Sequence, residues 1–203
     1  MSAPPYSELE SLFEQIYAAP IILTQTTTLG HLAVLPVLVG RKDAVLLDRQ
    51  VHASVQMAAG LLRAKNIHVE ALRHNDLGEV ERRASALAAT HPRVWYLADG
   101  VYSMYADVAP VDELCDLQQS IPQLFTYYDD AHGMSWTGKN GRGFVLGERP
   151  IPERTIVALS FGKGFGVGAG ACLVFSDPED ARRVRNCGGP LNFSGPMPPA
   201  TLG

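Results

Sequence analysis

Seven short apolar runs, separated by longer polar and mixed segments, limit the folds open to this chain of 203 residues. Each run is bounded by polar residues or glycine, a pattern typical of buried strands. The segments between several of them have helical spacing, and strands that alternate with helices need crossover connections. We therefore predict an α/β fold with a mostly parallel seven-stranded sheet and helices on both faces. The predicted strands are residues 21–24, 44–47, 67–72, 94–98, 124–128, 155–159 and 171–175.

Four segments have apolar and charged residues at helical spacing: residues 7–18, 52–65, 76–90 and 111–120. No internal repeat or linker divides them, which favours one layered unit. From Cys187 onward, glycine and proline are too frequent for a regular element, so this tail is expected to be extended. We predict a large domain over residues 1–186, incomplete at its N-terminus, and a tail over 187–203 that leads toward a missing C-terminal domain.

Composition and charge argue against several classes of partner. The net charge of -4 leaves no basic stripe for a nucleic acid backbone. The N-terminus has no basic region followed by an apolar stretch, and no apolar run approaches the ~18 residues of a membrane span. The three cysteines show no CxxC spacing, which fits a reducing compartment. We expect a cytoplasmic protein without a nucleic acid or membrane partner.

Reactive side chains follow several predicted strands directly. In doubly wound sheets, ligands bind outside the carboxyl ends of the strands. Asp48, Asp99, Asp129 and Ser160 each come at such a position. We therefore expect a binding site where these strand ends meet.

Lys163 lies between Gly162 and Gly164, where the backbone can approach a ligand closely. Desolvation there would favour the free amine, which attacks carbonyl groups. The glycine context alone leaves a solvated loop lysine equally open. Three other motifs are rejected: a strand-like run follows the GxGxxA match, the SxxK match has no companion motifs, and no GxxxxGK[ST] loop exists.

Asp129 comes directly after the predicted buried strand 124–128, and His132 follows three residues later. A metal site is disfavoured because the other histidines lack paired ligand spacing, so we predict none. Asp129 could be a helix N-cap, or it could keep a heterocyclic nitrogen protonated, as an electron-sink cofactor requires. The local pattern leaves both roles open.

Several motifs in fixed order resemble the α-oxoamine synthases. This group of pyridoxal-phosphate (PLP) enzymes, related to class I/II aminotransferases, includes 8-amino-7-oxononanoate synthase and glycine C-acetyltransferase. The motifs are DRQVHAS at 48–54, His74-Asn75-Asp76, DGVYSM at 99–104, DDAH at 129–132, GKNGRG at 138–143, SFGKGFG at 160–166 and Met197-Pro-Pro. The resemblance implies the large domain of a fold-type I PLP transferase.

The resemblance also implies roles for individual residues. Lys163 would form the Schiff base with PLP, Asp129 would pair with the pyridine nitrogen, and His132 would reach the phenolic oxygen. His52 would stack on the ring, and Ser103 would lie beside its oxygen. The phosphate would be held by Ser160 and by a glycine-aromatic turn matched at Gly30 and His31.

The implied reaction is a decarboxylative condensation of a small amino acid with an acyl-CoA, in at least a homodimer. The family's SMDGD reads Ser103-Met-Tyr-Ala-Asp107 here, and a family serine is replaced by Pro196. The family's enzymes are also longer. Aminotransfer and a non-catalytic PLP-fold subunit are the alternative functions.

Overall fold

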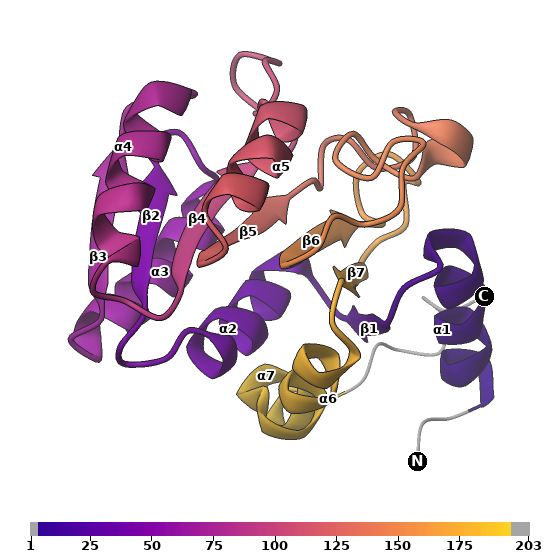
Figure 1. Cartoon of the computed structure of the whole chain (residues 1–203). Helices are drawn as coiled ribbons and strands as arrows, with labels where there is room; N and C mark the ends of the chain where they lie inside the picture. Colours follow the sequence, from indigo (N-terminus) through magenta and orange to yellow (C-terminus); the bar gives the residue numbers. More distant parts are fainter. Residues whose placement is uncertain (1–3, 196–203) are drawn as a thin grey trace.

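The computed structural model describes residues 4–195 and contains a seven-stranded sheet (Figure 1). Its strands are β1 (Ile21–Thr24), β2 (Ala44–Asp48), β3 (His68–Leu72), β4 (Val94–Asp99), β5 (Leu124–Asp129), β6 (Thr155–Ser160) and β7 (Ala171–Phe175). Their order is β1-β7-β6-β5-β4-β2-β3. Among the described strands, β7 runs antiparallel to β1 and β6, and the other neighbouring pairs are parallel. The predicted mostly parallel sheet is confirmed, with each strand at its predicted place.

Helices cover both faces of the sheet, as predicted. α1 (Pro4–Tyr17), α4 (Leu77–Ala88) and α5 (Val111–Ser120) pack on one face, whereas α2 (Thr27–Leu38), α3 (Ala53–Ala64) and α6 (Pro178–Cys187) pack on the other. Side chains alternate between the two cores, as strand geometry requires. In β4, Tyr96 contributes to the first core, and Trp95 and Leu97 contribute to the second.

Helix α2 was not predicted, because its sequence lacks helical periodicity. It begins with threonines and contains Gly30 and Pro36, which are poor helix formers. It is also apolar around much of its circumference, since it packs against the sheet and against α3 and α6. A helix enclosed in this way shows no polar stripe. Burial overrides local propensity here.

The prediction of an extended tail from Cys187 onward is wrong for the first residues. Cys187 ends α6, and a short helix, α7 (Gly189–Phe193), follows it. Gly188 joins the two, because its N–H donates to Val184 O at 2.7 Å and its carbonyl accepts from Leu191 N at 3.0 Å. Proline is well tolerated in a first helical turn, where Pro190 lies. Pro196 and the Met197-Pro-Pro motif lie outside the described residues.

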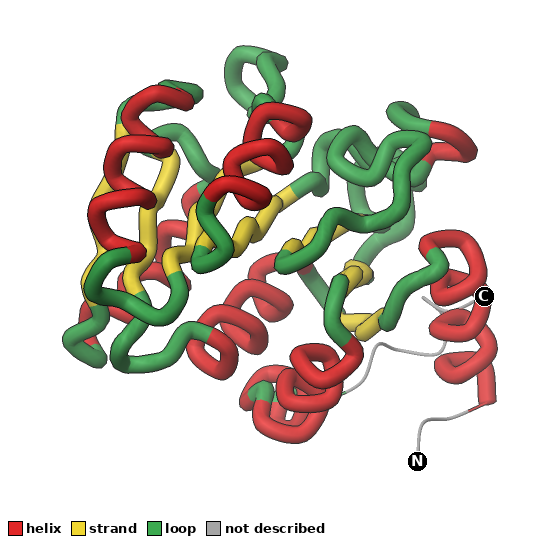
Figure 2. The backbone as a smooth tube through the Cα atoms, in the orientation of Figure 1, coloured by secondary structure: helices red, strands yellow, loops and turns green. Residues whose placement is uncertain are grey.

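Long irregular segments follow the carboxyl ends of β4, β5 and β6 (Figure 2). The longest, residues 130–154, contains only the short 3-10 helix η1 (Lys139–Gly141). These segments form the edge of the sheet at which the predicted site residues lie. Within residues 4–195, no helix combines the length and apolar character needed to cross a membrane.

Truncation of Leu46 tests how much the buried side chains of the central strands contribute to the free energy of unfolding. The Leu46 side chain is fully buried in β2, whereas Leu61 on α3 is 44% exposed. We expect Leu46→Ala to lower the free energy of unfolding by about 2–5 kcal/mol, because it leaves a cavity. Leu61→Ala is the matched control and should lower it by less than about 1 kcal/mol. Chemical denaturation measures both, and equal losses would contradict the assignment of the core.

Candidate active site

The parallel strands bring the predicted site residues to one edge of the sheet. Asp99 ends β4 and Asp129 ends β5, and the two are paired in register. Asp129 is paired in turn with Ala158, two residues before Ser160 at the end of β6. The expected convergence of strand ends is therefore present.

Lys163 contacts His132 directly, Nζ to Nε2. Lys163 is exposed, so the desolvation suggested by its glycine context is not observed. His132 is half-buried, and burial together with the Lys163 charge lowers the pKa of its imidazole, against an opposing effect of Asp129. A neutral imidazole can accept a hydrogen bond from the lysine ammonium. The two side chains form one acid-base pair.

The glycine at 164 lets two loops meet beside this pair. A Cβ atom on Gly164 would lie 1.6 Å from Ser135 Oγ and 2.6 Å from Met134 O. Any side chain there would push the Lys163 loop away from the segment that follows His132. Close approach of two backbones explains this glycine of the SFGKGFG motif.

Asp129 is buried, and its partners hold it ionised. His31 Nε2 lies 3.1 Å from Asp129 Oδ2, and Ala131 N donates to Oδ1 at 3.1 Å. Burial alone would raise the pKa of Asp129, but the His31 imidazole, the Ala131 N–H and His52 outweigh it and lower the pKa. His31 Nδ1 lies 2.6 Å from the hydroxyl of buried Tyr127. A carboxylate held in this way can keep a protonated ring nitrogen charged.

His31 therefore differs from its predicted role in a phosphate-binding turn. It is fully buried inside α2 and supports Asp129 from behind the site. No local signal pointed to this role, because the two residues are 98 positions apart in the sequence.

Gly30 also lies within α2 and not in a turn. Its N–H donates to Thr26 O at 3.0 Å, and Thr26 Oγ1 accepts from Leu29 N at 3.1 Å. The N–H groups of residues 27 and 28 belong to the first turn, where helical N–H groups have no intrahelical acceptor. These groups, and not those of Gly30 and His31, suit an anion.

Ser160 lies beside this helix start. Thr24 at the end of β1 and Ser160 at the end of β6 both pair with Ala171 of β7, one from each side. Ser160 is largely buried, at 9% exposure. A hydroxyl and the helix N–H groups therefore face the same part of the edge, as a phosphate would require.

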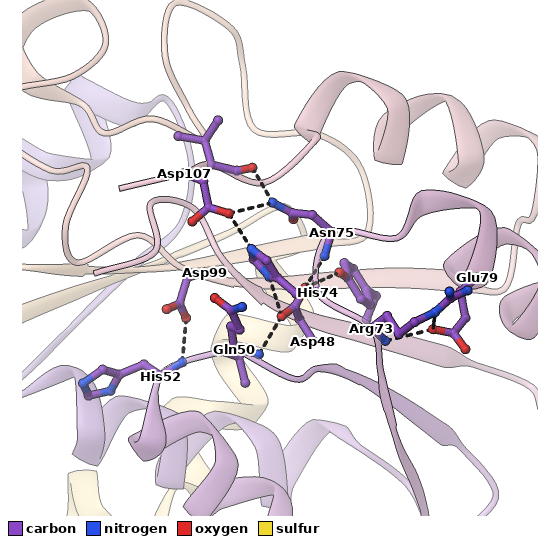
Figure 3. A network of polar contacts seen from close by, with 12 residues as sticks. Asp48, Gln50, His52, Arg73, His74, Asn75, Glu79, Asp99 and Asp107 are labelled. Atoms are coloured by element: carbon purple, nitrogen blue, oxygen red, sulfur yellow. Dashed lines mark hydrogen bonds and ion pairs between the residues drawn. The ribbon is translucent and has the colours of Figure 1, made fainter. Parts of the chain in front are cut away.

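His52 caps the N-terminus of α3. Its ring Nδ1 accepts from Ser54 N at 3.3 Å and lies 2.6 Å from Ser54 Oγ. Its backbone N–H donates to Asp99 Oδ1 at 3.0 Å (Figure 3). The residue is exposed, which leaves its ring free to stack on a ligand. Ser103 lies on an exposed hairpin after β4.

No individual role was predicted for two further acids at the edge, Asp99 and Asp130, although Asp99 was expected there as a strand-end residue. Burial and the neighbouring Asp129 raise the pKa of Asp99 to about 8. Burial likewise raises the pKa of Asp130 to about 7, against the opposing effect of the Val145 N–H. Their position at strand ends was the available signal. Near neutral pH both can carry a proton while Asp129 does not.

The donor set fits PLP. Lys163 offers an amine for the aldehyde, Asp129 an ionised acid for the pyridine nitrogen, and Ser160 with the start of α2 offers donors for the phosphate. Among residues 4–195, no cluster of three or more His, Cys, Asp or Glu side chains could hold a metal ion.

Comparison with known proteins agrees with this geometry. The family model for aminotransferase class I and II matches residues 11–203. The 8-amino-7-oxononanoate synthase of Maricaulis maris is 34% identical over 177 residues, covering 86% of this chain and 43% of that protein. The serine palmitoyltransferase of Caulobacter vibrioides is 30% identical over 194 residues, covering 95% and 46%.

A solved structure shares the fold. The serine palmitoyltransferase of S. paucimobilis with bound PLP-myriocin aldimine superposes with a TM-score of 0.86 at 26% identity, covering 99% of this chain and 50% of that one. The chain thus spans about half the length of the curated relatives it matches. Because the family model covers more than half of the chain, the protein belongs to the aminotransferase class I and II family, and its relatives include α-oxoamine synthases.

Proposed function

We propose that this chain is the PLP-binding part of an α-oxoamine synthase, which condenses a small amino acid with an acyl-CoA and releases carbon dioxide and CoA. The observation that carries the proposal is the contact between Lys163, which follows β6, and His132. His132 comes three residues after the ionised Asp129, which ends the neighbouring strand β5. The named relatives, 8-amino-7-oxononanoate synthase and serine palmitoyltransferase, support this reaction class.

PLP, when bound, withdraws electrons from the substrate Cα and so stabilises negative charge there. Asp129 would keep the proton on the pyridine nitrogen, and His31 would keep Asp129 ionised. Without that proton the ring is a weaker electron acceptor. The buried His31–Asp129 pair therefore serves the chemistry from behind the ring.

Lys163 would hold the cofactor covalently through Nζ and, once displaced by the substrate amine, would take the proton from Cα. His132 Nε2 contacts that Nζ and can accept its proton. The lowered pKa of His132 suits this role, because the imidazole must be neutral to accept. His52 would pack on the ring face, Ser160 would bind the phosphate, and Ser103 would lie beside the phenolic oxygen.

We also propose a homodimer in the cytoplasm, with residues 1–186 as the cofactor-binding domain and 187–203 leading toward a further domain. All three cysteines are free, which supports a reducing compartment. Large apolar side chains on the loops of the site edge are exposed, as at a surface that a second subunit covers. They are Met104 (84%), Tyr105 (74%), Trp136 (69%) and Phe165 (54%).

Lys163→Ala tests the cofactor anchor. The purified chain with PLP should show the visible absorbance of a lysine-bound cofactor, and Lys163→Ala should abolish it, because no other amine lies at this position. Lys139→Ala is the matched control: this lysine is also exposed and lies in the loop after His132, and the band should persist. An unchanged band in Lys163→Ala would refute the proposed anchor.

Release of free CoA tests the reaction class. We expect release when the complete synthase that contains this PLP-binding part is incubated with PLP, an acyl-CoA from a panel, and glycine, alanine or serine, because condensation breaks the thioester. Asp129→Asn should slow it by about 100-fold or more, since the pyridine nitrogen loses its charged partner. The exposed Asp116→Asn serves as control. Amino transfer without CoA release would identify an aminotransferase instead.

A further inference from the structure

His74 lies between two carboxylates from different parts of the chain (Figure 3). Its Nδ1 is 2.9 Å from Asp48 Oδ1, and its Nε2 is 2.5 Å from Asp107 Oδ2. A neutral imidazole has a single N–H, so it can donate to only one of them. With both carboxylates ionised, both contacts are hydrogen bonds only when the ring is protonated. The geometry is that of an imidazolium held by two anions.

Asp48 forms the fixed side of this arrangement. It ends β2 and is fully buried. Besides His74, its carboxylate accepts from Gln50 N at 2.8 Å, Asn75 N at 2.9 Å and the Tyr96 hydroxyl at 3.2 Å. Four donors from three segments leave Asp48 little freedom to move.

Asp107 forms the other side, at the end of an exposed hairpin. Val101 and Val108 close the hairpin through an isolated bridge, and Tyr102 N donates to Asp107 O at 2.9 Å. The hairpin carries Ser103, and Met104 at its tip is 84% exposed. Tyr102 is buried in the core at 1% exposure and fixes the outgoing side of the hairpin, whereas residues 103–106 are exposed. The ion pair of Asp107 with His74 therefore matters for the position of the returning side.

The other groups around His74 are uncharged or are paired with other residues. The Tyr102 and His74 rings lie nearly perpendicular, at 84°, with their centroids 4.4 Å apart. Arg73, the adjacent cation, is ion-paired away from it with Asp76 and Glu79. Asn75 Nδ2 donates to Val108 O at 3.0 Å and lies 3.5 Å from Asp107 Oδ2, a second link to the hairpin that carries no charge. The charged groups that face the ring are Asp48 and Asp107.

We propose that His74 is a positioning residue: in its protonated form it ties the 101–108 hairpin to β2 and thereby holds Ser103 at the cofactor edge. The role of Ser103 rests on the proposed function. The tie itself does not, because it can be measured without PLP.

The sign of the pH dependence follows from the partners of His74. Burial disfavours the imidazolium, but Asp107 and Asp48 outweigh burial and raise the pKa of His74. The stabilisation is therefore fully present below the ordinary histidine value of about 6.5. It is lost as the pH rises through the raised value in the folded protein. The hairpin should loosen on the alkaline side.

Amide hydrogen exchange of Tyr102 and Ala106, followed by NMR on the whole chain, tests the tie. The Ala106 N–H donates to Tyr102 O at 2.9 Å, so both amides report on the hairpin. In the wild type, their protection factors, which correct for the intrinsic pH dependence of exchange, should fall at least about tenfold between about pH 6 and about pH 9. Nitrogen shifts of His74 should show both ring nitrogens protonated at the lower pH.

Three variants separate the tie from a general structural role. His74→Gln should have low protection at both pH values. Asp107→Asn keeps an oxygen acceptor but removes the charge. The Tyr102 and Ala106 amides of this variant should be protected at low pH, and their protection should fall at a lower pH than in the wild type. His68→Gln is the matched control, because His68 on β3 is exposed and far from the hairpin in its contacts: it is paired with Glu70 at 3.2 Å, and its ring lies 5.9 Å from that of His91. It should behave as the wild type.

Equal protection in His74→Gln and His68→Gln, or a wild-type hairpin indifferent to pH, would overturn the inference. A global loss of protection in His74→Gln would make Asp107→Asn the deciding variant. Absence of the PLP band in the wild type would instead contradict the proposed function, so the two failures are distinguishable.

Discussion

Four buried carboxylates at one edge of the sheet impose the main physical constraint on this protein. Asp48, Asp99, Asp129 and Asp130 are each at most 4% exposed, and their strands place them close together. A buried carboxylate is strongly unfavourable unless it is hydrogen-bonded, paired with a cation or protonated. Asp48 is hydrogen-bonded by several donors, Asp129 is paired with His31, and burial raises the pKa of Asp99 and Asp130 so that both can be protonated. Those solutions account for much of the surrounding structure.

Asp130 shows how this constraint reaches into the loops. Its Oδ2 accepts from Val145 N at 3.0 Å, which fastens the 133–147 segment to the end of β5. Three glycines surround the carboxylate: Cβ atoms at Gly100, Gly133 and Gly143 would lie 2.4, 2.2 and 2.5 Å from its oxygens. Gly143 also has a φ of +99°, which a side chain would strain. The last glycine of the GKNGRG motif is thus explained by packing around a buried acid.

The sequence predicts the sheet well because its central strands are short, continuously apolar and bounded by polar residues. It does not identify three helices: α2, whose enclosure removes the periodic signal, α6, and α7, whose glycine and proline content was taken to exclude a helix. For the site, the position of a residue after a strand drew attention to Asp129 and Ser160, and the glycine context drew attention to Lys163. The resemblance to the α-oxoamine synthases was needed to give each of them a role. Position after a strand could not reveal the support of Asp129 by His31, because only the folded sheet brings α2 behind β5. The helix start at Thr26 was also missed for lack of a predicted helix.

The central claim is that PLP is bound covalently to Lys163. Borohydride reduction of the protein mixed with PLP, followed by proteolysis and mass spectrometry, locates the attachment directly. The chain has four lysines, at positions 42, 65, 139 and 163, so the assignment is unambiguous. We predict a pyridoxyl group on Lys163 at stoichiometric yield. Modification spread over Lys42, Lys65 and Lys139, or none at all, would contradict the account.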